Sequence, residues 1–255
     1  MNKLLIIDGL NLVRRIHAVL PDENDITSVQ ERVLAASKKM LVQHQPTHCI
    51  VVWDGSEPSW RKTLYSDYKK GRKPMPTALS DGLANIKTTL AEHDIHSFDA
   101  QSEADDVIAT IAMKMISNNG EVVIVSTDKG FSQLPTKNLT LWDHFNQHVF
   151  DVQQYEKKLG IEQYQMLDFI ALAGDSGNKI PGIMGIGPKS AADLLNKFRT
   201  LANLYRSLDN LGAKQAHKLA EGKEIARISY KLAQLQCDMP LNINLKQFRT
   251  NLRPN

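Results

Sequence analysis

The stretch that decides the fold is Ser102, Glu103, Ala104, Asp105, Asp106, followed by the apolar run Val107 to Ile116. It predicts a helix whose start carries three acids within four positions. Ordinary capping explains part of this, because Ser102 suits an N-cap and an acid three residues later suits the positive end of the helix dipole. Taken alone, the stretch therefore indicates no more than a well-capped helix.

Three other stretches, far apart in the chain, each read as a strand followed by an aspartate. They are short, apolar and rich in β-branched residues, which is the pattern of parallel strands buried on both faces. The strands and their acids are Leu4 to Ile7 with Asp8, Ile50 to Trp53 with Asp54, and Val122 to Ser126 with Asp128. An aspartate after a strand also commonly caps the next helix, and this reading stays open for Asp8.

These acids are expected to meet, because the functional crevice of an open α/β sheet lies at the carboxyl ends of its strands. The helix that begins near Glu103 completes the group. Two carboxylates about 4 Å apart repel by roughly 4 kcal/mol at an effective dielectric near 20, so a larger group requires a cation. Many oxygen ligands favour Mg²⁺ or Mn²⁺. The sequence predicts a divalent-metal site for phosphoryl chemistry.

The order of the remaining elements indicates the fold class. Strands alternating with helices predict an α/β core with a parallel-rich central sheet and flanking helices. Helices are expected over 12–20, 27–44 and 77–93, and short strands over 95–98, 139–142 and 148–150. From about residue 151 the pattern is all helical, with a helix-hairpin-helix at about 163–198. We predict an α/β metal-site domain over 1–150 and a helical domain over 151–255.

Composition narrows the class of protein. The 255 residues are 42% hydrophobic and 23% charged, as in soluble globular proteins with a substantial core. No stretch approaches the roughly 18 apolar residues of a membrane span, and the amino terminus shows no signal-peptide pattern. Cys49 and Cys237 suggest neither a disulfide framework nor a zinc site. We expect a cytoplasmic monomer without membrane contact.

Residues 60–74 form a predicted basic arm after Asp54. The arm interleaves aromatic and basic residues and ends in glycine and proline: Trp60, Arg61, Lys62, Tyr65, Tyr68, Lys69, Lys70, Gly71, Arg72, Lys73 and Pro74. Charge runs are often merely solvated loops. Aromatic faces beside cations are, however, what single-stranded nucleic acid binds. The mild net charge of +3, with basic flanks around an acidic centre, suits a polyanionic substrate.

The glycine-rich run before Lys189 is the second candidate binding feature. Pro188 starts a helix after a glycine turn, and it separates Gly187 from Lys189, so the run is not a Walker nucleotide loop. A hairpin whose glycine amides, Lys189 and Ser190 receive a DNA phosphate at a helix N-terminus fits better. Helical hairpins are also common packing units, which remains the alternative.

With these motifs in order, the chain resembles the 5′ nuclease, or flap endonuclease, family from residue 4 to about 235. The resemblance implies a metal-dependent, structure-specific hydrolase that cuts 5′ flaps or 5′ ends of branched DNA in replication and repair. It implies Mg²⁺ ligands at Asp8, Asp54, Glu103 and Asp105, while our reading of the strands adds Asp128. Lys69 and Arg72 match the cations that meet the scissile phosphate.

The resemblance also extends to the helical part. It implies that the hairpin holds the duplex backbone beside the single-strand junction, and that carbonyl oxygens there bind a potassium ion. The hairpin residues are Gly185, Ile186, Gly187, Pro188, Lys189 and Ser190. The expected potassium ligands are the carbonyls of Leu172, Ala173, Pro181, Ile183 and Ile186.

Two positions depart from the family pattern. Gly130 follows Thr127, Asp128 and Lys129, and Asn178 follows the Gly174 to Gly177 run, where the family has aspartates for a second metal. One hypothesis is a nuclease in which Lys69 and Arg72 supply more of the charge stabilisation. Another is a structure-selective DNA-binding protein with little or no catalysis. A third is an RNA nuclease of similar α/β type, against which the duplex-binding hairpin argues.

Overall fold

The structure is a computed structural model that describes residues 2–250. By its internal contacts the chain divides into two compact units. The α/β unit runs up to Glu57, continues over Lys73–Phe150 and resumes at Leu235, whereas the helical unit comprises Pro58–Arg72 and Asp151–Gln234. The domain limits 1–150 and 151–255 stay a prediction; in the structure most of the basic arm groups with the helices.

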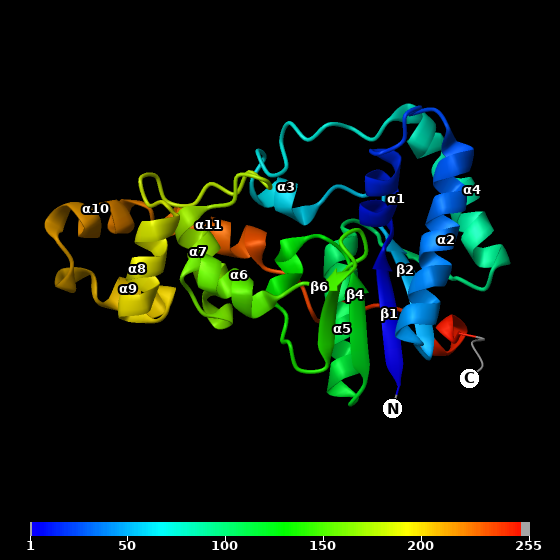
Figure 1. Cartoon of the computed structure of the whole chain (residues 1–255). Helices are drawn as coiled ribbons and strands as arrows, with labels where there is room; N and C mark the ends of the chain where they lie inside the picture. The colour runs from blue at the N-terminus through cyan, green and yellow to red at the C-terminus, as the bar shows by residue number, and fades with distance from the viewer. Residues whose placement is uncertain (1, 251–255) are drawn as a thin grey trace. The chain divides into compact units, whose positions relative to one another are not determined.

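Six strands form one sheet in the α/β unit, in the order β3-β2-β1-β4-β5-β6 (Figure 1). All neighbours are parallel except β5 and β6. The strands are β1 (Lys3–Asp8), β2 (His48–Trp53), β3 (Ser97–Asp99), β4 (Glu121–Val125), β5 (Leu139–Asp143) and β6 (His148–Val149). In this register Ile7 lies between Val51 and Val125, so the three acid-bearing strands are adjacent at the centre of the sheet.

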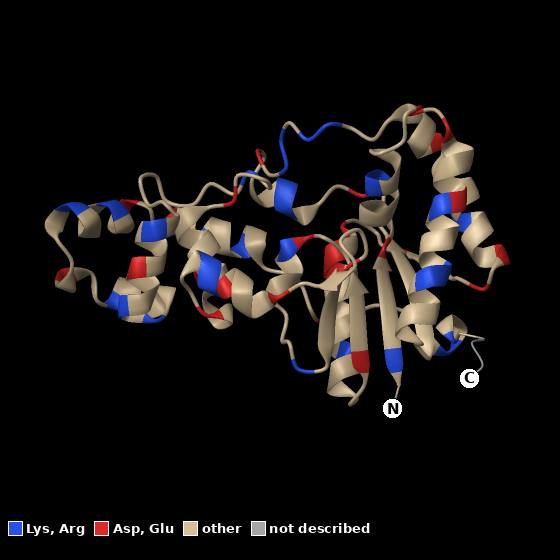
Figure 2. Cartoon of the chain, viewed as in Figure 1, with Lys and Arg blue, Asp and Glu red and all other residues tan. Residues whose placement is uncertain are grey.

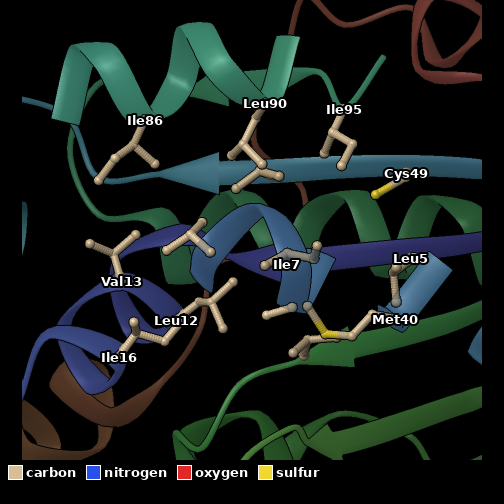
Figure 3. Close-up of a cluster of buried hydrophobic side chains, with 14 of the residues drawn as sticks. Leu5, Ile7, Leu12, Val13, Ile16, Met40, Cys49, Ile86, Leu90 and Ile95 are labelled. Carbon is tan, nitrogen blue, oxygen red and sulfur yellow. The ribbon is translucent and has the colours of Figure 1, made fainter. Parts of the chain in front are cut away.

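Helices cover both faces of this sheet. Leu5 and Ile7 of β1 pack with Met40 and Leu90 in one buried cluster beneath α1 (Gly9–His17), α2 (Ile26–His44) and α4 (Thr77–Glu92) (Figure 3). The alternate residues of the strands face α5 (Ala104–Ser117), which contacts β1, β2 and β4. Each fully buried aliphatic side chain contributes about 1.5–3 kcal/mol, so the sheet centre is firmly held.

The last described segment returns to the α/β unit. A short 3₁₀ turn, η4 (Leu245–Phe248), buries Phe248, which is 2% exposed. Arg249 then bridges to His48 at the amino end of β2, and the hydroxyl of Thr250 donates to the carbonyl of Pro46 at 2.6 Å. The described part of the tail, up to residue 250, shows no pattern in the sequence but contacts the start of β2 and the residues before it.

The helical unit packs around a second core, which includes Leu172, Leu195, Leu204 and Leu219. The helix-hairpin-helix consists of η2 (Gln163–Gln165) and α7 (Met166–Ala173), a loop, and α8 (Pro188–Phe198). The other elements are α3 (Trp60–Leu64), α6 (Val152–Leu159), α9 (Leu201–Arg206), η3 (Leu208–Asn210), α10 (Ala213–Glu221) and α11 (Lys223–Ala233). The predicted fold class is confirmed. No helix described between residues 2 and 250 is long and apolar enough to cross a membrane.

Candidate functional site

Asp8 lies where β1 ends and α1 begins. Its Oδ1 accepts a hydrogen bond from the Asn11 amide at 3.1 Å, and its Oδ2 accepts one from the Ser126 hydroxyl at 2.8 Å. Burial raises its pKa to about 7; the two hydrogen bonds oppose this, and the charges of Asp54 and Asp128 add to it. Asp8 thus caps α1, and it also lies within electrostatic reach of the other two strand-end acids.

Asp54 joins the end of β2 to the start of α5. Its Oδ1 accepts a hydrogen bond from the amide of Ala104, the first residue of the helix, at 3.1 Å. The next residue must be glycine, because a Cβ at Gly55 would lie 2.1 Å from two backbone carbonyl oxygens. This close approach brings the β2 end to the helix start, where Glu103 is buried and Asp105 is half-buried.

Asp128 follows β4 through a turn. Its amide donates to the Ser126 hydroxyl at 3.1 Å, and its Oδ1 accepts from the Gly130 amide at 2.7 Å, which caps the 3₁₀ helix η1 (Lys129–Gln133). Ser126 therefore contacts both Asp8 and Asp128. In Figure 2 acidic residues gather near the carboxyl ends of the central strands.

Asp8, Asp54, Glu103, Asp105 and Asp128, called the rim below, offer donor atoms that fit a divalent cation. All five predicted ligands offer carboxylate oxygens, and Asp8 is buried beside negative neighbours whose charge a cation would neutralise. Within residues 2–250 no three His, Cys, Asp or Glu side chains are grouped so that they could hold a metal ion. The carboxylates of Asp54 and Asp128 cap backbone amides instead.

Asp106, the third acid of the opening stretch, has a structural partner. It is 2% exposed, and its Oδ1 accepts a hydrogen bond from the Gln236 amide at 3.0 Å. Thr110, one turn along α5, donates to the Gln236 carbonyl at 3.1 Å and accepts from the Met239 amide at 3.3 Å. Asp106 therefore helps to fix α5 against the segment that returns from the helical unit.

Within the helical unit, the basic arm has buried as well as exposed members. Arg61 is 2% exposed and Tyr68 is 5% exposed. The guanidinium of Arg61 lies over the Trp60 ring, 4.5 Å from its centroid, and donates to the carbonyls of Leu232 and Gln234 at 2.9 and 2.7 Å. Arg61 thus fastens the arm to the end of α11, and the exposed cations lie further along.

Lys69 and Arg72 belong to the turn that ends the arm. Lys69 has a left-handed backbone with φ of 53°, and its amide donates to the Asn178 carbonyl at 2.8 Å. Nη2 of Arg72 donates to Oδ1 of Asn178 at 2.6 Å, while Nδ2 of Asn178 donates to Oδ2 of Asp175 at 2.7 Å. The departure from the family pattern at Asn178 is therefore part of a hydrogen-bond chain.

The expected potassium ligands lie where two backbone segments come very close. Gly182 has φ of 62°, and a Cβ on it would lie 2.3 Å from the Gly174 amide nitrogen. A Cβ on Gly174 would lie 2.6 Å from the Ile180 carbonyl oxygen. Because both positions are glycine, the backbone at the end of α7 packs directly against the following loop, where the Leu172 carbonyl accepts a hydrogen bond from the Ile183 amide at 2.8 Å.

The hairpin before α8 is open to solvent. Gly187 is the N-cap and Pro188 occupies the first turn, so no N-cap side chain covers the first amides of α8. Met184 is 93% exposed. Lys218, which the sequence reading missed, lies beside the hairpin, since a Cβ on Gly185 would be 2.7 Å from its Nζ. Figure 2 shows further Lys and Arg along these helices.

The matches to known families cover both units. Residues 3–160 match the 5′-3′ exonuclease, N-terminal resolvase-like domain, and residues 161–254 match the 5′-3′ exonuclease, C-terminal SAM fold. The chain belongs to the 5′-3′ exonuclease family. It is 94% identical to the flap endonuclease Xni of Shewanella frigidimarina over 251 residues, which cover 98% of each chain. It is 74% identical to that of Shewanella denitrificans over 249 residues, or 98% and 99% of the two chains.

Solved structures share the fold of this 5′-3′ exonuclease. The bacteriophage T5 5′-exonuclease with bound zinc matches 92% of this chain and 90% of its own, with a TM-score of 0.78 at 20% identity. The catalytic core of Rad2 in complex with DNA matches 96% and 84%, with a TM-score of 0.61 at 16% identity. Family membership confirms the prediction of a structure-specific 5′ nuclease that hydrolyses phosphodiester bonds.

Several residues of this 5′-3′ exonuclease escaped the sequence reading. Ser126 stands between two predicted ligands, and the only local signal for it is a hydroxyl residue directly after a buried strand. Asn178 was noted only as a missing carboxylate, and Lys218 had no signal beyond its charge. Their contacts join positions that are distant in sequence, which a pattern search does not detect.

Proposed function

We propose that this 5′-3′ exonuclease cuts DNA at 5′ flaps or 5′ ends near single-strand/duplex junctions, with Mg²⁺ or Mn²⁺ held by Asp8, Asp54, Glu103, Asp105 and Asp128. The observation that carries the proposal is the buried carboxylate of Asp8, whose pKa burial and the neighbouring Asp54 and Asp128 raise to about 7. The divalent ions bound to the T5 enzyme support it. We propose further that the chain acts as a monomer in the cytoplasm.

The residues of the rim would act together on one phosphate. When bound, a divalent cation supplies an activated water and polarises the phosphoryl oxygen. Ser126 and the Asn11 amide hold Asp8 in one orientation, and Gly55 allows Asp54 to reach the start of α5. Lys69 and Arg72 would stabilise negative charge on the scissile phosphate, more so where only one cation is bound.

The hairpin would hold the duplex through its backbone. The start of α8 offers the first-turn amides of Lys189 and Ser190, which have no intrahelical partner, together with the Lys189 ammonium, and Lys218 adds a second cation beside Gly185. The close approach of Gly174 and Gly182 supports a potassium ion on the neighbouring carbonyls, whose positive charge would favour a phosphate nearby. These contacts read no bases, so selectivity would come from the shape of the junction.

The proposal is tested by Asp105→Ala, with Asp81→Ala, an exposed acid on α4 of the same unit, as the matched control. We expect Asp105→Ala to abolish single-turnover cleavage of a 5′-flap duplex over a range of Mg²⁺ concentrations while its Kd for the flap changes little. Asp81→Ala should cut like the parent chain. Unchanged turnover by Asp105→Ala would overturn the site, and binding without cleavage by the parent would favour a DNA-binding protein.

A further inference from the structure

Asn178 is the shared partner of Arg72, Lys69 and Asp175 in the helical unit. Its backbone carbonyl accepts the Lys69 amide at 2.8 Å, and its side chain takes both roles that an amide offers. Oδ1 accepts from Nη2 of Arg72 at 2.6 Å, and Nδ2 donates to Oδ2 of Asp175 at 2.7 Å. The guanidinium is therefore connected to a carboxylate through one short, uncharged side chain.

Asp175 is itself fixed by the loop that it closes. Its amide and carbonyl exchange hydrogen bonds with Ile180 at 2.9 and 2.8 Å, and its Oδ1 accepts the Gly177 amide at 2.9 Å. Its remaining oxygen, Oδ2, needs a donor, so the amide of Asn178 must turn its nitrogen toward Asp175 and its oxygen toward Arg72. Asp175 thus sets the orientation of the amide, and the amide sets that of the guanidinium.

We propose that Asn178 is a positioning residue that orients Arg72 for the scissile phosphate, an inference that rests on the proposed function of Arg72. An amide suits this role because it combines an acceptor for the guanidinium with a donor for the carboxylate. An aspartate at this position would still accept from Arg72, but it would face Asp175 with a second carboxylate and no proton to donate. The asparagine amide keeps the hydrogen bonds from Arg72 to Asp175 in place without an added cation.

Removal of the side chain tests the link. We expect Asn178→Ala to slow single-turnover cleavage of a 5′-flap duplex by about 10- to 100-fold, the effect of a small misplacement of a catalytic group. The Kd for the flap, measured by fluorescence anisotropy without divalent cations, should stay within about 3-fold, because the variant keeps the Arg72 charge and so the number of cations available to the phosphate backbone. Asn196→Ala is the control, since Asn196 also donates to a carbonyl in this unit, at 2.9 Å.

The link predicts that the two residues do not act independently. In an Arg72→Ala background, Asn178→Ala should slow cleavage by less than about 2-fold more, because the group that it orients is gone. A second design avoids truncation altogether. Asn178→Asp alone should slow cleavage, and adding Asp175→Asn should restore it to within about 3-fold of the parent, since the exchanged pair keeps the net charge and every donor and acceptor.

The outcomes separate this inference from the proposed function. Three results would overturn the positioning role of Asn178 and leave the role of Arg72 in place. Asn178→Ala could cut at the rate of the parent chain, its effect could multiply with that of Arg72→Ala, or the exchanged pair could be as slow as Asn178→Asp. Parental cleavage by Arg72→Ala would instead remove the proposed role of Arg72, and the inference with it. If the alanine variant does not fold, as judged by circular dichroism, the exchanged pair still decides.

Discussion

Arg61→Met should destabilise the helical unit strongly, although the substitution removes a surface-type residue from a segment that reads as a basic loop. The side chain is 2% exposed and donates to two backbone carbonyls near the end of α11. Methionine keeps most of the apolar stem and fills a similar volume. The loss in the free energy of unfolding therefore comes mainly from the missing guanidinium and from the two carbonyls that lose their donor.

The magnitude follows from those partners. Hydrogen bonds to charged groups contribute about 1.5–3 kcal/mol each, and the stacking on Trp60 adds about 0.5–1 kcal/mol. The desolvation that burying a guanidinium costs is recovered in the variant and offsets part of this. We expect a net loss of about 2–4 kcal/mol in the free energy of unfolding, by the same principles.

Equilibrium urea unfolding followed by circular dichroism measures this loss. The matched control is Arg227→Met, because the Arg227 side chain is 57% exposed and pairs with Glu224, three residues away. A surface pair of this kind contributes about 0–1 kcal/mol. Amide hydrogen exchange should accelerate in α3 and the end of α11 but not in β1. The reasoning is refuted if Arg61→Met costs no more than Arg227→Met.

Three further predictions concern close approaches and a buried thiol. Gly55→Ala places a Cβ 2.1 Å from carbonyl oxygens, so it should lower the stability of the α/β unit by about 1–3 kcal/mol and slow flap cleavage, as thermal unfolding and single-turnover rates will show. Gly182→Ala, at φ of 62°, should weaken flap binding in anisotropy titrations. Gly212→Ala, with open space around it, should leave stability and flap binding unchanged, and equal effects of the two substitutions would contradict the reasoning from backbone crowding. Burial raises the pKa of the Cys49 thiol to about 12, so a thiol reagent at pH 8 should label it only in urea, as peptide mass spectrometry checks; native labelling at the unfolded rate would contradict this.

The strands were predictable where a buried apolar run is followed closely by an aspartate. The runs that became β1, β2 and β4 are continuous and apolar, each followed closely by an aspartate, and their observed limits differ from the predicted ones by one or two residues. β3 was expected over 95–98 but spans Ser97–Asp99. The reason is that Ile95 is apolar because it packs into the core, and it does not pair in the sheet. In a short apolar run, the sequence does not show whether a residue pairs in the sheet or only packs into the core.

The site was predictable only where its contacts follow from chain direction. Parallel strands carry Asp8, Asp54 and Asp128 to one end of the sheet, whichever side chains surround them. The supporting contacts depend on distant partners: Ser126 orients Asp8 across 118 positions, and Arg61 holds the basic arm on Leu232 across 171. No periodicity or local propensity records such pairs, so these supports emerge only once the chain is folded.

The same limit explains why counting acids misjudges a site in both directions. Asp105 and Asp106 are identical and adjacent, yet successive helix residues point about 100° apart, so that one is half-buried and the other is sealed against the returning chain. The carboxylate of Asp106 is buried and accepts a hydrogen bond from the Gln236 amide, so it holds the returning segment. At Asn178 the error reverses, because a residue scored as a missing ligand links Arg72 to Asp175. What a polar residue contributes is decided by the partner that it faces, and in both cases that partner lies on another segment of the chain.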